Sequence, residues 1–172
     1  MEKKDFIDLL KNRVSVRSFL DKEVSDEDIN FIMDAGKMAP TGMNRQPLLF
    51  IALKNKDIRK KYADLIKEFT ERPTDAYYDS PVVILFFSKD SPTKVLDGAA
   101  ALENMLLATA AIDLGVCLIH RSSFFFASEK GKQFQKEIGI GEEYECLESI
   151  ALGYIKGDKP QFKERVEGSK II

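Results

Sequence analysis

The spacing of apolar side chains along the chain predicts five helices. In the first three of them apolar residues recur every three or four positions, which is typical of helices that bury one face. Ser25 and Asp28 form a predicted capping box at the start of one helix, and Pro40 disfavours helical geometry beyond Met38. The predicted helices cover residues 5–12, 26–38, 56–69, 97–114 and 128–138.

Short runs of consecutive apolar residues predict four strands between these helices. The run from Val82 to Phe87 is the clearest, because all of its residues are apolar and several are β-branched or aromatic. Helices and strands alternate without forming clean βαβ units, which indicates an α+β fold built of layers. The predicted strands cover residues 48–53, 82–87, 116–119 and 147–154.

The remaining segments are predicted to be irregular. We expect a loop at residues 41–47, a mobile surface loop at residues 70–81 and an extended polar tail at residues 155–172. The sequence contains no internal repeat, low-complexity stretch or linker, so we expect a single domain over residues 1–172. A chain of this length can bury a sizeable core.

The helix predicted over residues 97–114 is apolar on nearly all sides. Such a helix is expected to be buried on most sides, and a small domain has few elements that can surround it. Burial in an interface between subunits is therefore favoured, with burial inside one chain as the alternative. A membrane span is not expected, because polar residues interrupt the apolar pattern: Asp97, Glu103, Asn104 and Asp113.

Charge and composition exclude several classes of binding partner and of metal site. The formal net charge is −2, so no general basic field attracts nucleic acid or a membrane of anionic lipid. The first residues lack the apolar segment of a signal peptide, and we expect a cytoplasmic protein. Cys117 and Cys146 do not have metal-ligand spacing, so no metal site is predicted. Two buried reduced thiols are favoured over a disulfide between them.

Two arginines and a serine alternate in the segment after the first predicted helix. In an extended chain Arg13, Ser15 and Arg17 share one face, while Val14 and Val16 share the other. Two guanidinium groups beside a hydroxyl suit a phosphate or the polar edge of a heterocycle, and the valines would anchor the segment to the core. A solvated basic turn is the alternative, and spacing alone favours it.

Two further segments offer polar groups to a ligand. Lys163 and Arg165 also share one face if the tail is extended, although a solvated tail is the simpler interpretation. Pro40 and Pro47 bracket a loop rich in Gly, Thr, Asn and Gln. This loop has groups for hydrogen bonding, and the plainer interpretation is a connection from helix to strand.

His120 is the only histidine, and it follows the strand predicted over residues 116–119. A lone histidine is more often structural than catalytic, so His120 is a weak candidate for a catalytic side chain, and we assign no other. Phe124, Phe125 and Phe126 follow in a predicted loop, where they would wall a pocket or fill the core.

Four segments, in this order, resemble the FMN-dependent nitroreductase family. They are RVSVRSF at 13–19, MAPTGMNRQP at 38–47, the small-residue helix at 97–116 and ALGYIKGDKPQFKERV at 151–166. The first resembles the family's R-x-S-x-R-x-F signature, the second its A-P-S-x-x-N-x-Q-P loop, and the last its G-Y pair followed by P-x-x-K-x-R. The chain departs from the family at residues 120–123, where many members have a Pro-x-Glu-Gly stretch.

The resemblance implies a homodimer with FMN in the interface between its subunits. Arg13, Ser15 and Arg17 would bind the phosphate, the ribityl chain and the flavin edge from one subunit. Lys163 and Arg165 would close on the phosphate, and residues 120–123 would lie beside the flavin ring. Residues 40–44 would reach the same FMN from the other subunit. The predicted cofactor-binding residues are Arg13, Val14, Ser15, Arg17, Pro40, Thr41, Gly42, Asn44, His120, Arg121, Ser122, Lys163 and Arg165.

The implied fold is a nitroreductase-like α+β fold, with a central mixed or antiparallel sheet flanked by helices and a C-terminal tail extending onto the partner subunit. The implied activity passes hydride from NADH or NADPH through the flavin to a small acceptor, such as a nitroaromatic or a quinone, in a ping-pong cycle. Two alternatives share the fold. One is a flavin-binding module without catalysis, and the other is an enzyme with different flavin chemistry, such as flavin destruction or dehalogenation.

Overall fold

A central sheet of four strands lies between two layers of helices in the computed structural model, which describes residues 2–166 and 168–171. The strands are β1 (Leu48–Leu53), β2 (Val82–Lys89), β3 (Gly115–Ile119) and β4 (Tyr144–Gly153). They stand in the order β1-β2-β4-β3, and all three neighbouring pairs are antiparallel. The predicted α+β class is therefore confirmed, and the sheet is antiparallel.

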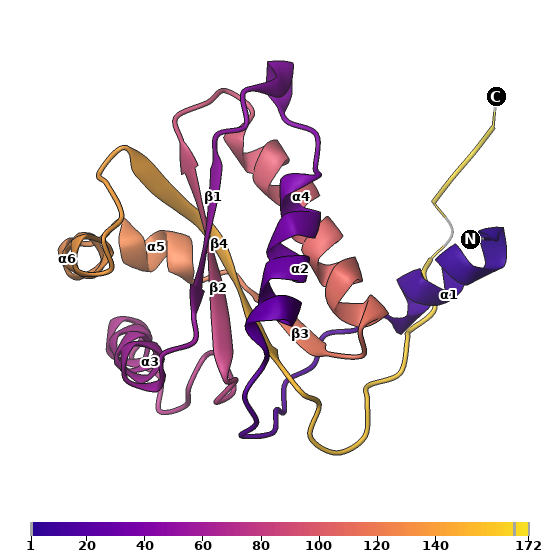
Figure 1. Cartoon of the computed structure of the whole chain (residues 1–172), viewed down its shortest axis with the longest axis horizontal. Helices are drawn as coiled ribbons and strands as arrows, with labels where there is room; N and C mark the ends of the chain where they lie inside the picture. Colours follow the sequence, from indigo (N-terminus) through magenta and orange to yellow (C-terminus); the bar gives the residue numbers. More distant parts are fainter. Residues whose placement is uncertain (1, 167, 172) are drawn as a thin grey trace.

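Helices cover both faces of this sheet (Figure 1). The helices are α1 (Lys3–Asn12), α2 (Asp26–Lys37), α3 (Lys56–Thr70), α4 (Lys94–Ala111), α5 (Ser122–Phe126) and α6 (Glu129–Glu137). Helices α2 and α4 pack on one face of the sheet, and α3, α5 and α6 pack on the other. Helix α1 lies outside these layers and contacts the end of α4.

Side-chain caps fix the start of three helices at the predicted positions. The Ser25 hydroxyl accepts the Asp28 N–H at 3.0 Å, and the Asn55 side chain accepts two N–H groups in the first turn of α3. The Ser128 hydroxyl accepts the Gly131 N–H at 3.2 Å. Each cap satisfies donors that the first turn of a helix leaves free, so these boundaries are set locally.

The sheet separates two hydrophobic clusters, which explains the apolar run in β2. Val83, Leu85 and Phe87 pack towards α3, α5 and α6, while the alternate residues Ile84 and Phe86 pack towards α2 and α4. All of these side chains are fully buried. A strand covered on both faces is apolar at every position rather than at alternate ones.

Three predictions about the buried and irregular segments are wrong. Residues 122–126 form helix α5 rather than a loop, and Phe125 is fully buried in the cluster below α3. The segment at residues 70–81 is more than a surface loop, because Tyr77 and Ser80 are fully buried. The apolar run at residues 48–53 predicts a buried strand, whereas strand β1 is half-buried because it lies at the edge of the sheet.

The other predicted elements are confirmed, with small differences at their ends. Helix α4 begins at Lys94 and β4 begins at Tyr144, in both cases three residues before the predicted start. Cys117 and Cys146 are buried free thiols, as predicted. Within the described chain, no helix combines the length and the apolar character that crossing a membrane requires.

The segment after α1 continues the sheet beyond β3. Ser15 forms a parallel bridge with Val116, and the Val16 N–H donates to the Val116 carbonyl at 2.9 Å. Further along, Phe19 forms an antiparallel bridge with Ile155, just after β4. The N-terminal segment and the start of the C-terminal tail therefore lie beside the same edge of the structure.

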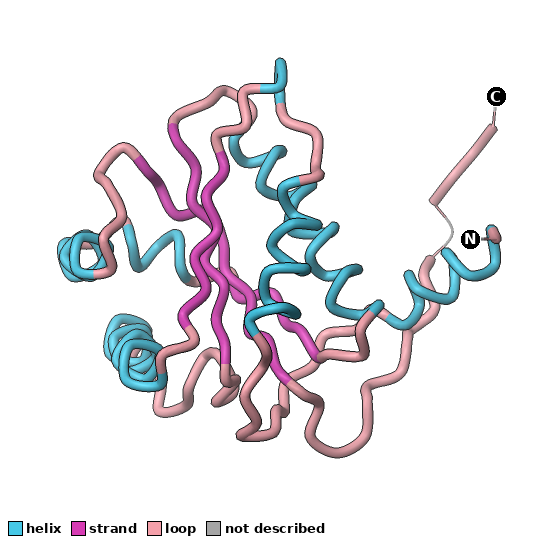
Figure 2. Tube along the Cα trace, viewed as in Figure 1, coloured by secondary structure: helices cyan, strands magenta, loops and turns pink. Residues whose placement is uncertain are grey.

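The tail contains no helix or strand among its described residues, 155–166 and 168–171, as predicted (Figure 2). The Lys159 ammonium donates to the Asn12 side-chain oxygen at 2.6 Å, so the tail passes the end of α1. Beyond that contact the tail leaves the body of the molecule (Figure 1). Residues 1, 167 and 172, which the single-domain and tail predictions include, lie outside the described residues.

Candidate functional site

The alternating arginine segment, residues 13–17, forms one border of the candidate site. Val14 and Val16 both pack against the cluster on the α3 side, as the alternation predicts. Arg17 is exposed, and Arg13 and Ser15 are partly exposed. The bridge between Ser15 and the start of β3 holds the segment in place, so its polar side chains are presented at the edge of the sheet.

The arginines of this border are not engaged inside the molecule. Among the described residues the only arginine ion pair joins Arg59 to Asp75 at 3.2 Å, whereas Arg13, Arg17 and Arg121 form none. A guanidinium group binds oxyanions through a planar fork of N–H donors. Two unpaired guanidinium groups beside a serine hydroxyl are therefore a donor set suited to a phosphate.

Part of the sheet beside the arginine segment is left uncovered by helices. Cys117 and Ile119 face the buried cluster on the α3 side, while Leu118 on the opposite face is 41% exposed. His120 continues this open face beyond the end of β3, and its side chain is 68% exposed. The Phe124 ring from α5 lies edge-on to the His120 ring, with 5.4 Å between the centroids. These side chains provide an apolar and aromatic surface next to the cationic border.

A carboxylate on the neighbouring strand holds the imidazole ring. Nδ1 of His120 contacts Oε1 of Glu148, which lies on β4. The register between β2 and β4 shifts here, because Leu147 is an extra residue between Cys146 and Glu148. The bulge lets Cys146 face the α3 side while Glu148 faces the opposite side, where the His120 ring lies.

Four buried hydroxyl groups fix the backbone on either side of His120. The hydroxyls of Tyr62, Tyr77, Ser122 and Ser149 are linked by contacts of 2.5 to 3.0 Å. The Ser149 hydroxyl also donates to the carbonyl of Ile119, the last residue of β3, at 3.0 Å. This hydroxyl cluster ties α3 and the start of α5 to the sheet.

Both tyrosines keep their protons under ordinary conditions. Burial raises the pKa of Tyr77 to about 12, and burial also raises the pKa of Tyr62 well above its usual value. Ser122 is fully buried within this cluster. Its side chain therefore supports the site from within the core, and its predicted contact with the cofactor stays a prediction.

The loop predicted over residues 41–47 contains a single 3₁₀ turn (Gly42–Asn44) and is held to α4 by a buried carboxylate. Asp97 accepts the Gly42 N–H through Oδ1 and the Thr93 hydroxyl through Oδ2, each at 3.0 Å. A Cβ atom at Gly42 would lie 2.2 Å from the Thr93 hydroxyl oxygen, so the close approach requires glycine.

The same loop keeps three non-glycine residues in the left-handed region. Met43, Asn44 and Gln46 have φ angles of 53°, 54° and 49°. Such backbone costs about 1 kcal/mol or more per residue and is common at functional sites. The Gln46 N–H donates to the Thr41 hydroxyl and its side-chain amide donates to the Asn44 side-chain oxygen, each at 3.0 Å. The loop is thus constrained from within, while the exposed Pro40 precedes it.

The loop and the arginine segment lie at opposite ends of α4 (Figure 1). Gly42 is bound to Asp97 near the start of the helix, while Asn12, the residue before Arg13, donates to the Ala110 carbonyl near its end. The 13 residues from position 97 to position 110 span about 20 Å at 1.5 Å per residue. A single chain therefore does not bring the two predicted halves of the site together.

The two cations of the tail are exposed and separate from the arginine segment. The Arg165 guanidinium lies 5.0 Å from the centre of the Phe162 ring and donates to the Lys163 carbonyl. Hydrogen bonds join the start of the tail to this region, from the Lys156 N–H to the Ser18 carbonyl and from Lys159 to Asn12, and none among the described residues joins Lys163 or Arg165 to residues 13–17. Their predicted convergence on one phosphate is therefore not seen within one chain.

Three supporting residues were not singled out for the site from the sequence. Asp97 was visible as a charge in an otherwise apolar helix, which is a signal for a buried partner. Glu148 interrupts an apolar strand in the same way, but its contact with His120 depends on the bulge. Tyr77 gave no signal, because it lies in a segment without periodicity.

Comparison with known proteins agrees with this arrangement. The sequence model of the nitroreductase family matches residues 10–154, a range that includes the arginine segment, the constrained loop and all four strands. The chain belongs to the nitroreductase family. A relative from Methanothermobacter thermautotrophicus, provisionally named NADH dehydrogenase/NAD(P)H nitroreductase, is 31% identical over 90% of this nitroreductase-family chain and 79% of its own length. The FMN reductase [NAD(P)H] of Bacillus subtilis is 26% identical over 98% of this chain and 61% of its own.

Solved structures agree on the fold of this family member. The crystal structure of a nitroreductase with bound FMN from Bacteroides fragilis superposes with a TM-score of 0.88. The match covers 100% of this chain and 98% of that one, at 22% sequence identity. A likeness at this identity establishes the fold alone, and the predicted nitroreductase-like fold is confirmed.

Proposed function

We propose that this protein is an FMN-dependent NAD(P)H oxidoreductase that passes hydride from NADH or NADPH to a small acceptor, such as a nitroaromatic or a quinone, in a ping-pong cycle. The observation that carries the proposal is the pair of unpaired guanidinium groups, Arg13 and Arg17, on either side of Ser15, which bridges to the strand that bears the uncovered face. A cationic border next to an apolar and aromatic floor suits a ligand with a phosphate at one end and a flat ring at the other.

The donor set fits FMN. Arg13, Ser15 and Arg17 supply forked N–H groups and a hydroxyl for the phosphate, the ribityl chain and the polar edge of the ring, and Val14 contributes its backbone. We place His120 and Arg121, at the open end of β3, beside the flavin ring. Lys163 and Arg165 are proposed to close on the phosphate when the tail folds over it.

A second subunit is proposed to complete the site. Pro40, Thr41, Gly42 and Asn44 are assigned to the same FMN, and in their own chain a stretch of α4 about 20 Å long separates their attachment from that of the arginine segment. Two chains arranged about a two-fold axis bring the loop of one subunit to the arginine segment of the other.

The surface of α1 supports this dimer independently of the cofactor. Helix α1 is amphipathic, yet none of its residues, all of them described, is buried. Phe6 and Ile7 on α1 are left exposed, as are Val95 and Leu96 on α4. Val95 and Leu96 lie at the start of α4 and α1 contacts its end, so exposed apolar side chains occur at both ends of this helix. Exposed apolar side chains of this kind are typical of a subunit interface. We also propose that the tail extends onto the partner subunit, because it leaves its own body after Lys159.

The residues of this chain have binding and orienting roles in the proposed reaction. Bound FMN supplies the chemistry, because it accepts hydride from a nicotinamide and passes electrons to a second substrate. A guanidinium at the polar edge of the ring, which we assign to Arg13, stabilises negative charge there. The hydroxyl cluster keeps the backbone beside the ring in one position. The two free thiols fit a reducing compartment, and we propose the cytoplasm for this single-domain protein.

An absorbance spectrum of the purified protein tests the proposal directly. Flavin bands that bleach under anaerobic NADH or NADPH, and return when a quinone is added, are the expected result. Bands that persist with both nicotinamides would point to a flavin-binding module without this activity. Failure to bind added FMN would reject the cofactor and the proposed function together.

A further inference from the structure

We propose that His120 and Glu148 form an acid–base pair that delivers a proton to the electron acceptor. The inference rests on the proposed function, because it names the proton source for the same site. His120 is the catalytic residue in this proposal, and Glu148 positions it.

The contact between the two side chains fixes which ring nitrogen is free. Nδ1 of His120 faces Oε1 of Glu148, so Nδ1 carries the proton that the carboxylate accepts. Nε2 is then the nitrogen that exchanges protons with a ligand or with water. The Phe124 ring, edge-on at 5.4 Å, limits rotation of the imidazole away from this position.

The fold builds this contact with an irregularity in the sheet. The extra residue Leu147 turns Glu148 to the side of the sheet where the His120 ring lies. In an unbroken strand Cys146 and Glu148 would share a face, and Glu148 would point into the cluster on the α3 side. Bulges of this kind re-aim a side chain next to active sites.

The carboxylate has a second oxygen for which the described residues provide no partner. Oε2 of Glu148 is buried and accepts no hydrogen bond from them. An unsatisfied buried carboxylate oxygen is costly, so a purely structural role gives little reason to keep Glu148 here. Holding a charged imidazole at the ligand face gives such a reason, because the negative carboxylate balances the imidazolium that donates the proton.

The transfer of electrons and protons balances when the acceptor is a quinone. The nicotinamide loses a hydride, which carries two electrons, and the quinone gains that hydride together with one proton. The proton comes from the Nε2–H of the His120 imidazolium, and water returns one to Nε2 before the next turnover. Two electrons and two hydrogen atoms thus reach the hydroquinone, and His120 ends unchanged.

The first test compares two electron acceptors with the FMN-loaded enzyme. Benzoquinone takes up hydrogen with its electrons, whereas ferricyanide takes up electrons alone. His120→Gln is expected to lower turnover with benzoquinone by about 10²-fold, at the low end of general acid catalysis because the ring is largely exposed. Because His120 is also assigned to the cofactor site, its replacement affects both acceptors through FMN, and the proton-donor role is measured by how much further the benzoquinone rate falls than the ferricyanide rate. Glu148→Gln should lower the benzoquinone rate in the same direction, and Glu145→Gln, on the same strand, is the matched control.

The second test needs no change at His120 itself, because the signals of the single histidine can be assigned directly. Nitrogen-15 NMR of the holoenzyme reports which ring nitrogen carries the proton. Neutral His120 is expected to be protonated at Nδ1, and Glu148→Gln is expected to shift both nitrogen signals, while Glu145→Gln leaves them in place. A predominance of the Nε2–H form in the wild type would overturn the pairing.

The outcomes separate this inference from the proposed function. Equal losses with both acceptors in His120→Gln would overturn the proton-donor role, and so would wild-type rates with both. In either case the wild-type reduction of benzoquinone would still support the proposed function. A wild-type enzyme that reduces neither acceptor would overturn both.

Discussion

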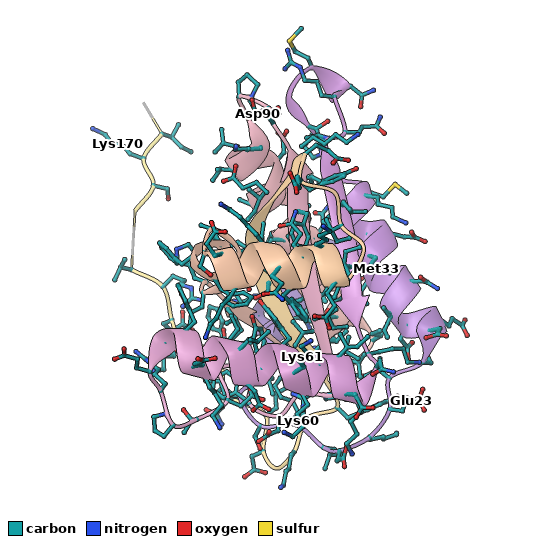
Figure 3. The ribbon with its side chains drawn as sticks, turned by 90° about the vertical axis from the view of Figure 1, so that its left-hand side faces the viewer. Glu23, Met33, Lys60, Lys61, Asp90 and Lys170 are labelled. Atoms are coloured by element: carbon teal, nitrogen blue, oxygen red, sulfur yellow. The ribbon has the colours of Figure 1, made fainter. Side chains whose placement is uncertain are left out.

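Two surfaces of the molecule differ in how far they expose apolar side chains, since Ile58 and Phe69 on α3 reach 40% and 42% exposure whereas Val95 and Leu96 on α4 reach 67% and 72%. On the α3–α6 surface, charged side chains point outward and join in ion pairs, with Lys61 2.5 Å from Glu137 and Lys130 2.5 Å from Glu68 (Figure 3). On the surface of α1 and α4, Phe6, Ile7, Val95 and Leu96 are exposed. We call the second one the α1–α4 surface, defined by these four apolar residues.

The difference indicates what each surface meets. Exposed ion pairs contribute little to stability, but a mixed charged surface remains in water without associating. Exposed apolar side chains on two adjoining helices are expected to be covered by protein. The helix that bridges the two halves of the site, α4, belongs to the apolar surface. We therefore expect α3 and α6 to face solvent and α1 and α4 to face the second subunit.

Introducing a charge into the proposed interface should have the largest effect of the changes considered. Ile7→Glu places a carboxylate in the proposed interface, where an uncompensated charge costs about 3–5 kcal/mol. We expect monomers in sedimentation velocity at micromolar concentration, together with loss of FMN. Ile58→Glu on α3 is the matched control, because Ile58 is 40% exposed and Ile7 is 47% exposed. If both variants sediment as dimers, the α1–α4 surface is not the interface.

Removal of a cofactor contact should have the next largest effect. Arg17→Ala is expected to weaken FMN binding by about 1–3 kcal/mol, because it removes a charge-assisted hydrogen bond. Lys163→Ala and Arg165→Ala are expected to fall in the same range. Quenching of flavin fluorescence during titration measures the affinity, and Arg72→Ala, an exposed arginine at the end of α3, is the control. Unchanged affinity in all three variants would reject the phosphate assignment.

The hydroxyl cluster beneath α3 should have an intermediate effect on stability. Tyr77→Phe removes one member while the other three stay linked, so we expect a loss of about 1 kcal/mol in the free energy of unfolding. Urea unfolding followed by circular dichroism measures it. FMN affinity should change less than it does in Arg17→Ala, since Tyr77 lies on the far side of the sheet from the open face.

Ionisation of Tyr77 should make the stability of the fold depend on pH in the alkaline range. The folded pKa of Tyr77 is about 12 and the ordinary value is 10.0, so the unfolded chain loses this proton first. The stability that the buried hydroxyl contributes is complete below pH 10 and is lost as the pH rises through 12. The wild type should therefore lose more stability than Tyr77→Phe across this range. Parallel losses in urea unfolding would contradict the assignment of this titration to Tyr77.

An ion pair on the charged surface should have the smallest effect. Lys61→Met removes the pair with Glu137, in which both side chains are about half exposed. A pair in that position contributes at most about 0.5 kcal/mol, and less at high salt. Thermal unfolding at low and high salt measures the change. A loss as large as that of Tyr77→Phe would show that the charged surface also holds the fold together.

The elements that depend on local signals were predictable from the sequence. Helix α3 begins at Lys56, the predicted residue, because a cap and a periodic apolar face act within a few residues. Strand β2 was equally clear, because covered strands are continuously apolar. Helix α5 was missed because its five residues are too few to show a helical period, and Phe124 to Phe126 form a run without alternation.

The site was predictable only in part, because its geometry depends on pairing between strands. The arginine segment was recognised from its alternation, and its valines do anchor it. The contact between His120 and Glu148 depends on the bulge at Leu147. The register that creates this bulge depends on both paired strands, so it cannot be predicted from the sequence of one strand alone. The separation of Gly42 from Arg13 follows from their contacts with opposite ends of α4, and no local sequence pattern predicts those contacts.

The hydrogen bonds of Asp97 have a consequence for how activity depends on concentration. This carboxylate joins the constrained loop to α4, and its neighbour Leu96, 72% exposed, belongs to the α1–α4 surface. In the proposed dimer, contacts between subunits and contacts with FMN are therefore thermodynamically linked, and each strengthens the other. Specific activity should then fall as the enzyme is diluted below its dissociation constant, and added FMN should shift that midpoint to lower protein concentration.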